Sequence, residues 1–357
     1  MTQLLTYPDI DPQQWQALID RSPYATWFQT KEAYEFYAAV GGELIPFAYG
    51  VEEEGRLVGV IVGYTTKSTN AIQQYFTKRA IIYGGPLLAE DISDEALCAL
   101  LSAIAQCKVE GLKFKGVENS KADTPAFTPY TLHPTPIYIE SRNFHDYSKW
   151  RNIFEANGFA YQPHLNFHVD TSSVEVVDKN LGKSRKRDIR TTIRDGVTPV
   201  YQPTIEQVKQ YYQILQNLYT TKVKTPLFSW NFFEQLHRTE HARFILTEYQ
   251  GRIIGGTVCV ELPNRALYEW FACGEDGVYD HIYPSCYATY LGIKYAAESG
   301  CQIFDMMGAG KPEEAYGVRD FKAKFGGEMV EHGRFLCVRK PLLYWIGKIG
   351  VKLLKRK

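Results

Sequence analysis

The sequence predicts two α+β domains of the same fold, and three observations support this expectation. The chain has 357 residues, more than a single hydrophobic core usually serves. One β-hairpin pattern occurs twice, at 49–64 and at 246–261. Around both copies the expected order is helix, two hairpin strands, strand, helix and strand. That order favours mixed α/β sheets that are largely antiparallel with one parallel crossover.

The two hairpins are copies of one pattern. The segments GRLVG at 55–59 and GRIIG at 251–255 align at an offset of 196 residues (251 − 55). An aromatic helix precedes each hairpin. A further helix follows each, expected at 93–106 and 285–298, and then a short strand, GLKFKG from Gly111 and GCQIFD from Gly300. A period this long indicates domain duplication rather than a solenoid.

Capping residues mark two helix starts. Ser93 precedes an acidic first turn, and Thr204 with Gln207 forms a capping box for a helix over 205–221. The join between the domains is expected within 118–165, where several prolines favour extended chain or an edge strand.

The composition restricts the class of protein. The formal net charge is zero, so a polyanion must be met by a local patch. The seven cysteines form no C-x-x-C motif and indicate reduced core residues of a cytoplasmic protein. The amino terminus lacks the features of a signal peptide, and the apolar runs are too short to span a bilayer. His164 and His168 lie in an alternating, strand-like pattern, so no metal site is expected.

Residues 183–194 form the most basic stretch, and we expect an amphipathic helix. Lys186, Arg190 and Arg194 then form one line on the outer face, while Ile189 and Ile193 face inward. Neighbouring cations about 5–6 Å apart suit a ligand with several phosphates. We predict a phosphate- or nucleic-acid-binding face, and the alternative is a solvated helix surface. The six basic residues are Lys183, Arg185, Lys186, Arg187, Arg190 and Arg194.

The segment 304–328 joins a buried strand to a glycine-rich loop with cations and aromatic rings. Sheets of α/β type usually bind ligands at the carboxyl ends of their strands. Cations there can hold an anion or a developing oxyanion, and rings can exclude water. The alternative is a structural loop whose lysines only aid solubility. The candidate residues are Asp305, Tyr316, Arg319, Phe321 and Lys322.

Three motifs together resemble the FemABX family of aminoacyl transferases, which build peptidoglycan cross-bridges. They are KSRKRDIR at 183–190, FDMMGAGKP at 304–312 and GVRDFKAKFGGE at 317–328. The resemblance covers nearly the whole chain. It implies two tandem domains like the GCN5-related N-acetyltransferases, with the second inserted so that the carboxyl terminus returns to the first. We expect a first domain at 1–145, with 331–357 packing back on it, and a second at 146–330.

The resemblance also implies an activity. Family members move an amino acid from aminoacyl-tRNA to an amine on the stem peptide of a nucleotide- or lipid-linked cell-wall precursor. Their late Phe-Lys pair matches Phe321-Lys322, which gives Lys322 the catalytic role. A fixed ammonium can stabilise the oxyanion of ester aminolysis by about 3 kcal/mol. The substrate-binding set is then Phe321, Arg319, Tyr316, Asp305, Lys183, Lys186, Arg187 and Arg190, and no cofactor is required.

The chain departs from the family pattern at two places. It lacks the helical-arm insertion of some members, and Tyr37 lies near the position of their phosphate-binding lysine. The competing enzyme class is a CoA-dependent N-acyltransferase, which needs a glycine-rich loop at a helix start to hold the pyrophosphate. The expected helices begin YPSCYATYLG and SDEALCALLSA, without that loop. A third reading is a non-enzymatic RNA- or membrane-surface-binding protein.

The terminal segment 341–357 is predicted to be a basic amphipathic helix. Its apolar stripe consists of Leu342, Trp345, Ile346, Ile349 and Leu353, and its cations face away. Such a helix suits peripheral contact with the inner face of a membrane that carries a lipid-linked precursor. The alternative is that the stripe packs on the first domain.

Overall fold

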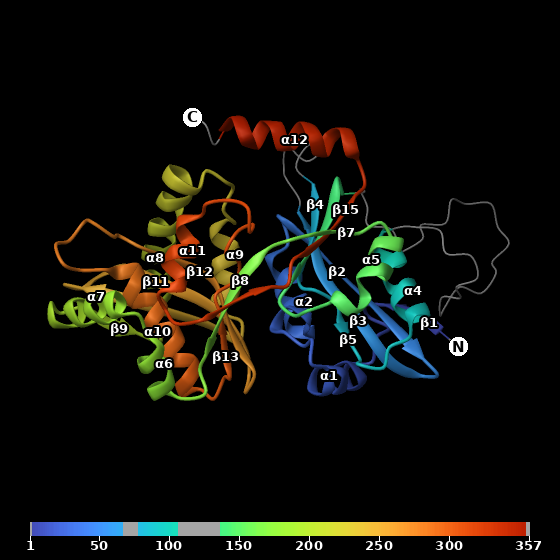
Figure 1. Ribbon diagram of the computed structural model, residues 1–357, viewed down its shortest axis with the longest axis horizontal. Helices are drawn as coiled ribbons and strands as arrows, with labels where there is room; N and C mark the ends of the chain where they lie inside the picture. Colours follow the sequence, from blue (N-terminus) through green and yellow to red (C-terminus); the bar gives the residue numbers. More distant parts are fainter. Residues whose placement is uncertain (1, 67–77, 106–135, 355–357) are drawn as a thin grey trace. The chain divides into compact units, whose positions relative to one another are not determined.

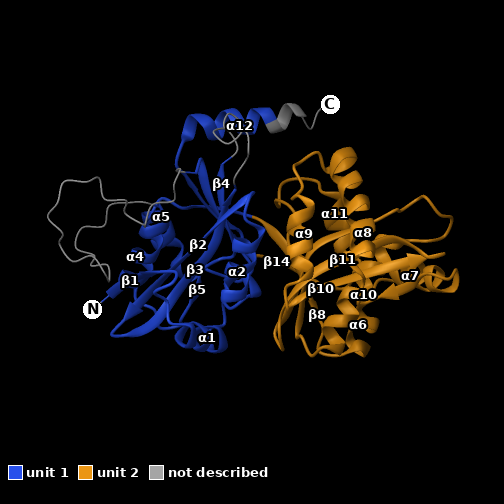
Figure 2. Cartoon of the chain, turned by 180° about the vertical axis from the view of Figure 1, so that it is seen from behind, with its two compact units in different colours: residues 1–163, 332–357 blue, residues 164–331 orange. Residues whose placement is uncertain are grey.

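The computed structural model describes residues 2–66, 78–105 and 136–354 (Figure 1). Residue contacts divide the chain into two compact units (Figure 2). Unit 1 comprises 1–163 and 332–357, and unit 2 comprises 164–331. Each contains a mixed sheet with helices packed against it, so the predicted fold class is confirmed.

Unit 1 has the strand order β1-β2-β3-β4-β6-β15-β7, with β5 beside β3. The pair β4–β6 is parallel and its neighbours are antiparallel. The strands are β1 (Thr2–Thr6), β2 (Leu44–Glu53), β3 (Arg56–Thr66), β4 (Arg79–Gly84), β5 (Leu87–Leu88), β6 (Tyr138–Asn143), β7 (Ala160–Gln162) and β15 (Arg334–Val338). The helices are α1 (Pro12–Arg21), α2 (Lys31–Val40), α4 (Asp94–Ala105), α5 (Arg151–Ala156) and α12 (Pro341–Leu354), with 3-10 turns at Trp27–Gln29 and Ser148–Trp150.

Unit 2 has the strand order β14-β8-β13-β12-β11-β10-β9. The pair β12–β13 is parallel. The strands are β8 (Leu165–Asp170), β9 (Thr198–Val200), β10 (Ala242–Tyr249), β11 (Arg252–Leu262), β12 (Ala266–Gly274), β13 (Ile303–Asp305) and β14 (Glu328–Glu331). The helices are α6 (Val174–Asn180), α7 (Lys183–Arg194), α8 (Ile205–Leu218), α9 (Trp230–His237), α10 (Pro284–Glu298) and α11 (Gly317–Ala323). A π-helical turn at Tyr219–Val223 follows α8.

The duplication extends to backbone detail. The β2–β3 register shifts after Val51 and the β10–β11 register shifts after Thr247, again 196 residues apart (247 − 51). Both turns have two left-handed residues in a row, with φ of 52° and 80° at 54–55 and of 51° and 75° at 250–251. Two such residues match the primed turn that suits the twist of a hairpin, and glycine meets the second requirement at low cost.

The chain crosses between the two units twice. The chain leaves β7 in unit 1 and enters β8 in unit 2 within two residues, and it returns between β14 and β15 in the same way. Strand β15 pairs with both β6 and β7 in the sheet of unit 1. Residues 146–163, which we assigned to the second domain, lie in unit 1 because β7 pairs with β15 there.

The local expectations have mixed outcomes. Ser93 Oγ accepts from Ala96 N at 3.1 Å, and the Thr204–Gln207 capping box is present. The strand expected from Gly111 lies outside the described residues. Residues 138–143, near the join, are extended as expected and form β6. The expected edge position is wrong, because β6 lies between β4 and β15.

Candidate active site

Strands β12 and β13 start as a parallel pair and then separate. Their ladder joins 266–268 to 303–305. Beyond it β12 continues along β11 to Gly274, whereas residues 306–310 follow β8. The register between β11 and β12 shifts where the two strands part, which leaves Trp270 as an extra residue in β12. A bulge of this kind bends its strand and interrupts pairing, which accounts for the separation.

The ammonium group of Lys322 lies at this separation. Lys322 belongs to α11 and is 8% exposed. Its Nζ donates to the backbone oxygen of Met306, to that of Met307 at 3.0 Å and to that of Gly308 at 2.9 Å. All three ammonium hydrogens therefore have acceptors. The lysine supplies donors to the carbonyl groups of the residues that follow β13, where this segment is no longer paired with β12.

Two buried carboxyl groups act on this ammonium. Burial lowers the pKa of Lys322, and the charges of Glu269 and Asp305 oppose the shift. Burial raises the pKa of Glu269, an effect that Lys322 opposes. Glu269 Oε1 also accepts from the hydroxyls of Thr289 at 2.9 Å and Thr257 at 3.2 Å. A charge held in so dry a place acts strongly on any group that reaches it.

Asp305 is held by a network from β8 and the loop. Its Oδ1 accepts from Asn166 Nδ2 and from Met307 N, both at 2.7 Å, and its Oδ2 lies 3.2 Å from His168 Nε2. Burial alone would raise the pKa of Asp305, but hydrogen bonding and charge from His168 lower it overall. Burial alone would lower the pKa of His168, but Asp305 raises it overall. The pair fixes the end of β13 and the start of the loop.

A second cation of α11 holds the next part of the loop. Arg319 Nε donates to Ala309 O at 2.9 Å, and its Nη2 donates to Lys311 O. The loop needs such support because Met307 has φ of 48°, in the left-handed region that costs a non-glycine residue energy. Arg319 and Lys322, on one face of α11, thus hold the loop that follows β13 against this helix.

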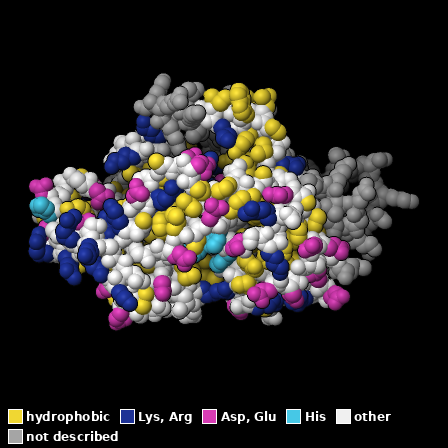
Figure 3. All heavy atoms as spheres, in the orientation of Figure 1, with side chains coloured by type: hydrophobic (Ala, Val, Ile, Leu, Met, Phe, Trp, Pro, Cys, Tyr) yellow, Lys and Arg dark blue, Asp and Glu magenta, His cyan; other side chains and the backbone are white. Residues whose placement is uncertain are grey.

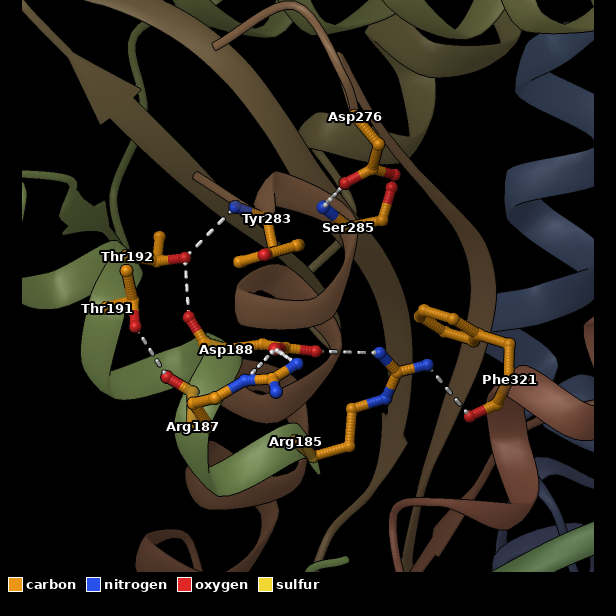
Figure 4. A network of polar contacts seen from close by, with 9 residues as sticks. All are labelled: Arg185, Arg187, Asp188, Thr191, Thr192, Asp276, Tyr283, Ser285 and Phe321. Carbon is orange, nitrogen blue, oxygen red and sulfur yellow. Dashed lines mark hydrogen bonds and ion pairs between the residues drawn. The ribbon is translucent and has the colours of Figure 1, made fainter. Parts of the chain in front are cut away.

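Phe321 joins the strand-exit loop to the basic helix α7. Its ring lies 4.4 Å from the guanidinium carbon of Arg185, whose Nη2 donates to Phe321 O at 3.4 Å (Figure 4). The same guanidinium contacts Asp188 at 3.5 Å. At the start of α7, a Cβ on Gly182 would lie 2.9 Å from Lys324 O, so the close approach of the two segments requires glycine. The two predicted sites are therefore adjacent.

Helix α7 buries Ile189 as predicted, but its inner face differs from the predicted one at Ile193. Its buried residues are Arg185, Asp188, Ile189 and Thr192. The expected inward position of Ile193 is wrong, since this side chain is 49% exposed. Thr192 takes the inner place because its hydroxyl donates to Asp188 O at 2.8 Å and accepts from Tyr283 N at 3.0 Å (Figure 4).

The outer face of α7 carries the predicted cations. Lys183, Arg187 and Arg190 are exposed and Lys186 is half-buried. Figure 3 shows basic side chains gathered where α7 lies. Arg187 Nη2 lies 3.0 Å from Asp188 Oδ1, and Lys186 Nζ donates to Lys179 O at 3.3 Å. The helix thus presents a basic surface beside the loop that holds Lys322.

The structure brings four of the sequence candidates together, namely Asp305, Arg319, Phe321 and Lys322. Tyr316 lies at the start of α11 and is 43% exposed. Sequence reasoning missed Glu269, although one acidic residue in the apolar run ALYEWFACG was a usable signal. It counted Arg185 among the basic residues of 183–194 but did not predict its burial, because the basic pattern does not reveal which cation is buried.

Part of the chain matches a known protein family. Residues 231–351 match the model of the FemAB family. The predicted family resemblance is confirmed. The matched segment contains β12, β13, the loop and α11. No curated protein matches the chain by sequence. The family match supports an acyl- or aminoacyltransferase, as the sequence predicted.

Solved structures of low identity share the fold. The crystal structure of FemX is similar with a TM-score of 0.66 and 14% identity, covering 96% of this chain and 99% of that one. L-PGS from Bacillus licheniformis has a TM-score of 0.54 and 14% identity, covering 95% and 96%. A tandem GNAT protein from the clavulanic acid biosynthesis pathway has a TM-score of 0.53 and 10% identity, covering 94% and 98%. Two tandem acetyltransferase-like domains are thus the shared architecture.

Metal-binding clusters and membrane-spanning helices are both absent from the described residues. No group of three or more His, Cys, Asp or Glu side chains in that part of the chain is arranged to hold a metal ion. Within the same residues, no helix combines the length and apolar character that crossing a bilayer requires.

Proposed function

We propose that this protein is an aminoacyltransferase of FemABX type, which moves an amino acid from aminoacyl-tRNA to an amine of a cell-wall precursor stem peptide. The observation that carries the proposal is the buried Lys322 ammonium where β12 and β13 part, within the segment that matches the family. The acceptor is a nucleotide- or lipid-linked precursor.

The proposed chemistry needs a positive charge at the reacting carbonyl. The acceptor amine attacks the ester carbon, a C–N bond forms, and negative charge develops on the carbonyl oxygen. When the ester C–O bond breaks, the ribose hydroxyl leaves with a proton and the amine loses one. A fixed ammonium stabilises the oxyanion by about 3 kcal/mol in a dry site.

The contacts of Lys322 set a condition on this role. Because three backbone oxygens already accept from Nζ, the substrate oxygen must replace one of them in order to accept directly. The 3.0 Å contact to Met307 is the longer of the two ordinary ones and involves a residue with left-handed φ. In this proposal that contact gives way when the acyl group enters.

The basic face of α7 supports a phosphate-bearing substrate. Its exposed cations adjoin the candidate site through the contact between Arg185 and Phe321. We propose that Lys183, Lys186, Arg187 and Arg190 meet precursor diphosphate or the tRNA acceptor end, where each cation that displaces a counterion strengthens binding at low salt.

The starts of α10 and α4, the two helices where CoA pyrophosphate would bind, disfavour the alternative of a CoA-dependent acyltransferase. At the start of α10, Asp276 Oδ1 accepts from Ser285 N at 3.2 Å (Figure 4). At the start of α4, Glu53 accepts from the hydroxyl of Ser93. A carboxylate occupies the dipole end that a pyrophosphate requires, and it repels that ligand.

The test is transfer of labelled amino acid from a charged tRNA pool to precursor. Lys322→Ala should lower turnover by about 10²–10³-fold with little change in substrate binding, because the charge acts in the transition state. Lys322→Arg should restore activity only in part, since a guanidinium is a wide planar fork. Lys324→Ala is the matched control, because Lys324 is exposed and only two residues away.

Folding must be measured in the same variants, because Lys322 also holds the loop. Near-ultraviolet circular dichroism and thermal unfolding report whether the loop and core persist. Equal losses of activity in the Lys322 and Lys324 alanine variants, or a Lys322 effect confined to substrate affinity, would show that the catalytic assignment is wrong. Acyl transfer from CoA but not from tRNA would replace the proposal with its alternative.

A further inference from the structure

The terminal helix α12 exposes the apolar stripe that we expected either to pack on the first domain or to meet a membrane. Leu342 is 70% exposed, Trp345 62%, Ile346 43% and Ile349 39%. The spacing i, i+3, i+4, i+7 places them on one side of the helix. Figure 3 shows hydrophobic side chains gathered where α12 lies. The packing alternative therefore does not account for the stripe.

A different face of α12 attaches the helix to unit 1. The ring of Tyr344 meets that of Tyr138 edge to face, with centroids 5.3 Å apart. At 100° per residue, Tyr344 lies far around the helix from the centre of the stripe. The helix is thus anchored by one side and presents its apolar side outward.

The charge around the stripe is of one sign. Residues 339–357 contain seven cations, Arg339, Lys340, Lys348, Lys352, Lys355, Arg356 and Lys357, and no acidic residue. The rest of the chain must carry the balancing negative charge, because the whole protein is neutral. An apolar stripe with a tryptophan, in a segment whose charged residues are all cations, fits the boundary between lipid headgroups and acyl chains.

We propose that α12 docks this protein on an anionic lipid bilayer, with Leu342, Trp345, Ile346 and Ile349 in the interface and the neighbouring cations on lipid phosphates. Binding does not depend on the proposed transferase activity. A second copy of this chain fits less well, because pairing two such helices brings the cations of both together. Transfer RNA would complement the positive charge of the segment, but it would not explain the exposed apolar stripe.

The experiment is flotation of the full chain with phosphatidylcholine vesicles that contain or lack about 30% phosphatidylglycerol. The purified protein should bind the anionic vesicles at least about 10-fold more tightly than the neutral ones, and added salt should weaken the difference. The double variant Trp345→Ala/Ile346→Ser should lose at least about 10-fold of the binding. Lys348→Glu should weaken binding only to anionic vesicles.

Two further measurements separate this contact from its competitors. Val278→Ser is the matched control, because Val278 is 64% exposed and lies in unit 2. It should bind vesicles as the unchanged protein does. Lipids with brominated chains should quench fluorescence of the unchanged protein more than that of Trp345→Phe, which keeps an apolar ring in the stripe.

Three outcomes would overturn the proposal. The first is no preference for anionic vesicles at any salt concentration. The second is a dimer in analytical ultracentrifugation that the double variant dissociates, because the stripe would then join two copies. The third is loss of tRNA binding in the double variant with vesicle binding unchanged.

Discussion

The parallel strand pairs of the two units differ in how far they stay together. In unit 1, β4 and β6 pair over six positions, 79–84 with 138–143. In unit 2, the corresponding β12 and β13 pair over three and then part at the bulge in β12. Five strands follow the same order in the two sheets, β1-β2-β3-β4-β6 in unit 1 and β9-β10-β11-β12-β13 in unit 2, so the separation is a local change within a shared arrangement.

The charged groups beside the two parallel strand pairs also differ between the units. In unit 1, Glu140 accepts from Arg142 at 2.9 Å and from Arg334 at 2.8 Å, so carboxylate and guanidinium groups pair with each other. In unit 2, the Lys322 ammonium is bound by backbone oxygens. Unit 1 therefore uses paired charges to join its strands. Unit 2 instead holds a cation at the point where its parallel strands separate.

The comparison predicts that breaking the Glu140 cluster affects stability more than activity. Glu140→Gln should lower the free energy of unfolding by about 3 kcal/mol, because it leaves two mostly buried guanidinium groups without a counter-charge. Denaturant titration measures this loss. If Glu140→Gln is stable but as inactive as Lys322→Ala, then the charged cluster of unit 1 serves activity and not stability, and the comparison is wrong.

The pH dependence of stability in Glu140→Gln provides a second test of the Glu140 cluster. Burial raises the pKa of Glu140, but Arg142 and Arg334 outweigh this and lower it to about 2. Because the folded pKa is depressed, the stabilisation is present above the unfolded value near 4.5 and is lost as the pH falls towards 2. Glu140→Gln should therefore differ most from the unchanged protein near neutral pH and least near pH 2.

Helix α7 of unit 2 provides a test of binding. Arg187→Glu/Arg190→Glu should weaken uncharged tRNA binding about 10-fold at low salt and flatten its salt dependence, because fewer counterions are released. Filter binding at two salt concentrations measures both effects. Arg238→Glu, at the residue that follows α9, is the control, since Arg238 is also exposed. If Arg238→Glu weakens tRNA binding as much as the Arg187→Glu/Arg190→Glu variant does, the binding depends on the total positive charge of the protein and not on the α7 face.

The His168–Asp305 pair predicts a smaller effect near neutral pH. The folded pKa of His168 is raised, so its stabilisation is present below the unfolded value near 6.5 and is lost as the pH rises through the folded pKa. His168→Gln should remove this part of the pH dependence, so the stability of the variant should fall less than that of the unchanged protein as the pH rises through this range. Thermal unfolding between about pH 5 and pH 8 tests it, and an unchanged slope would contradict the pairing.

The hairpin turns should behave alike in the two units. Gly55 and Gly251 have φ of 80° and 75°, and a Cβ at either position would meet open space. Gly55→Ala and Gly251→Ala should each cost on the order of 1 kcal/mol from backbone strain alone. Clearly unequal losses of unfolding free energy would mean that one turn has support which the other lacks.

The sequence by itself determined the repeat, the hairpins and the helix starts, because these depend on local patterns. Glycines at a fixed offset require the same turn twice, and Ser93 and Thr204 cap helices through neighbours three residues away. The position of the loop at 304–328 was also visible, because a break from apolar strand to glycine and cations is a local change of composition.

Only the tertiary structure decided what the charged and apolar side chains contact. Arg185 and Phe321 are 136 residues apart, and their contact selects Arg185 as the buried cation of α7. The acceptors of Lys322 exist because β12 bends away from β13. Periodicity placed Ile193 inside and left the α12 stripe ambiguous, since a pattern shows which residues share a face but does not say whether anything covers it.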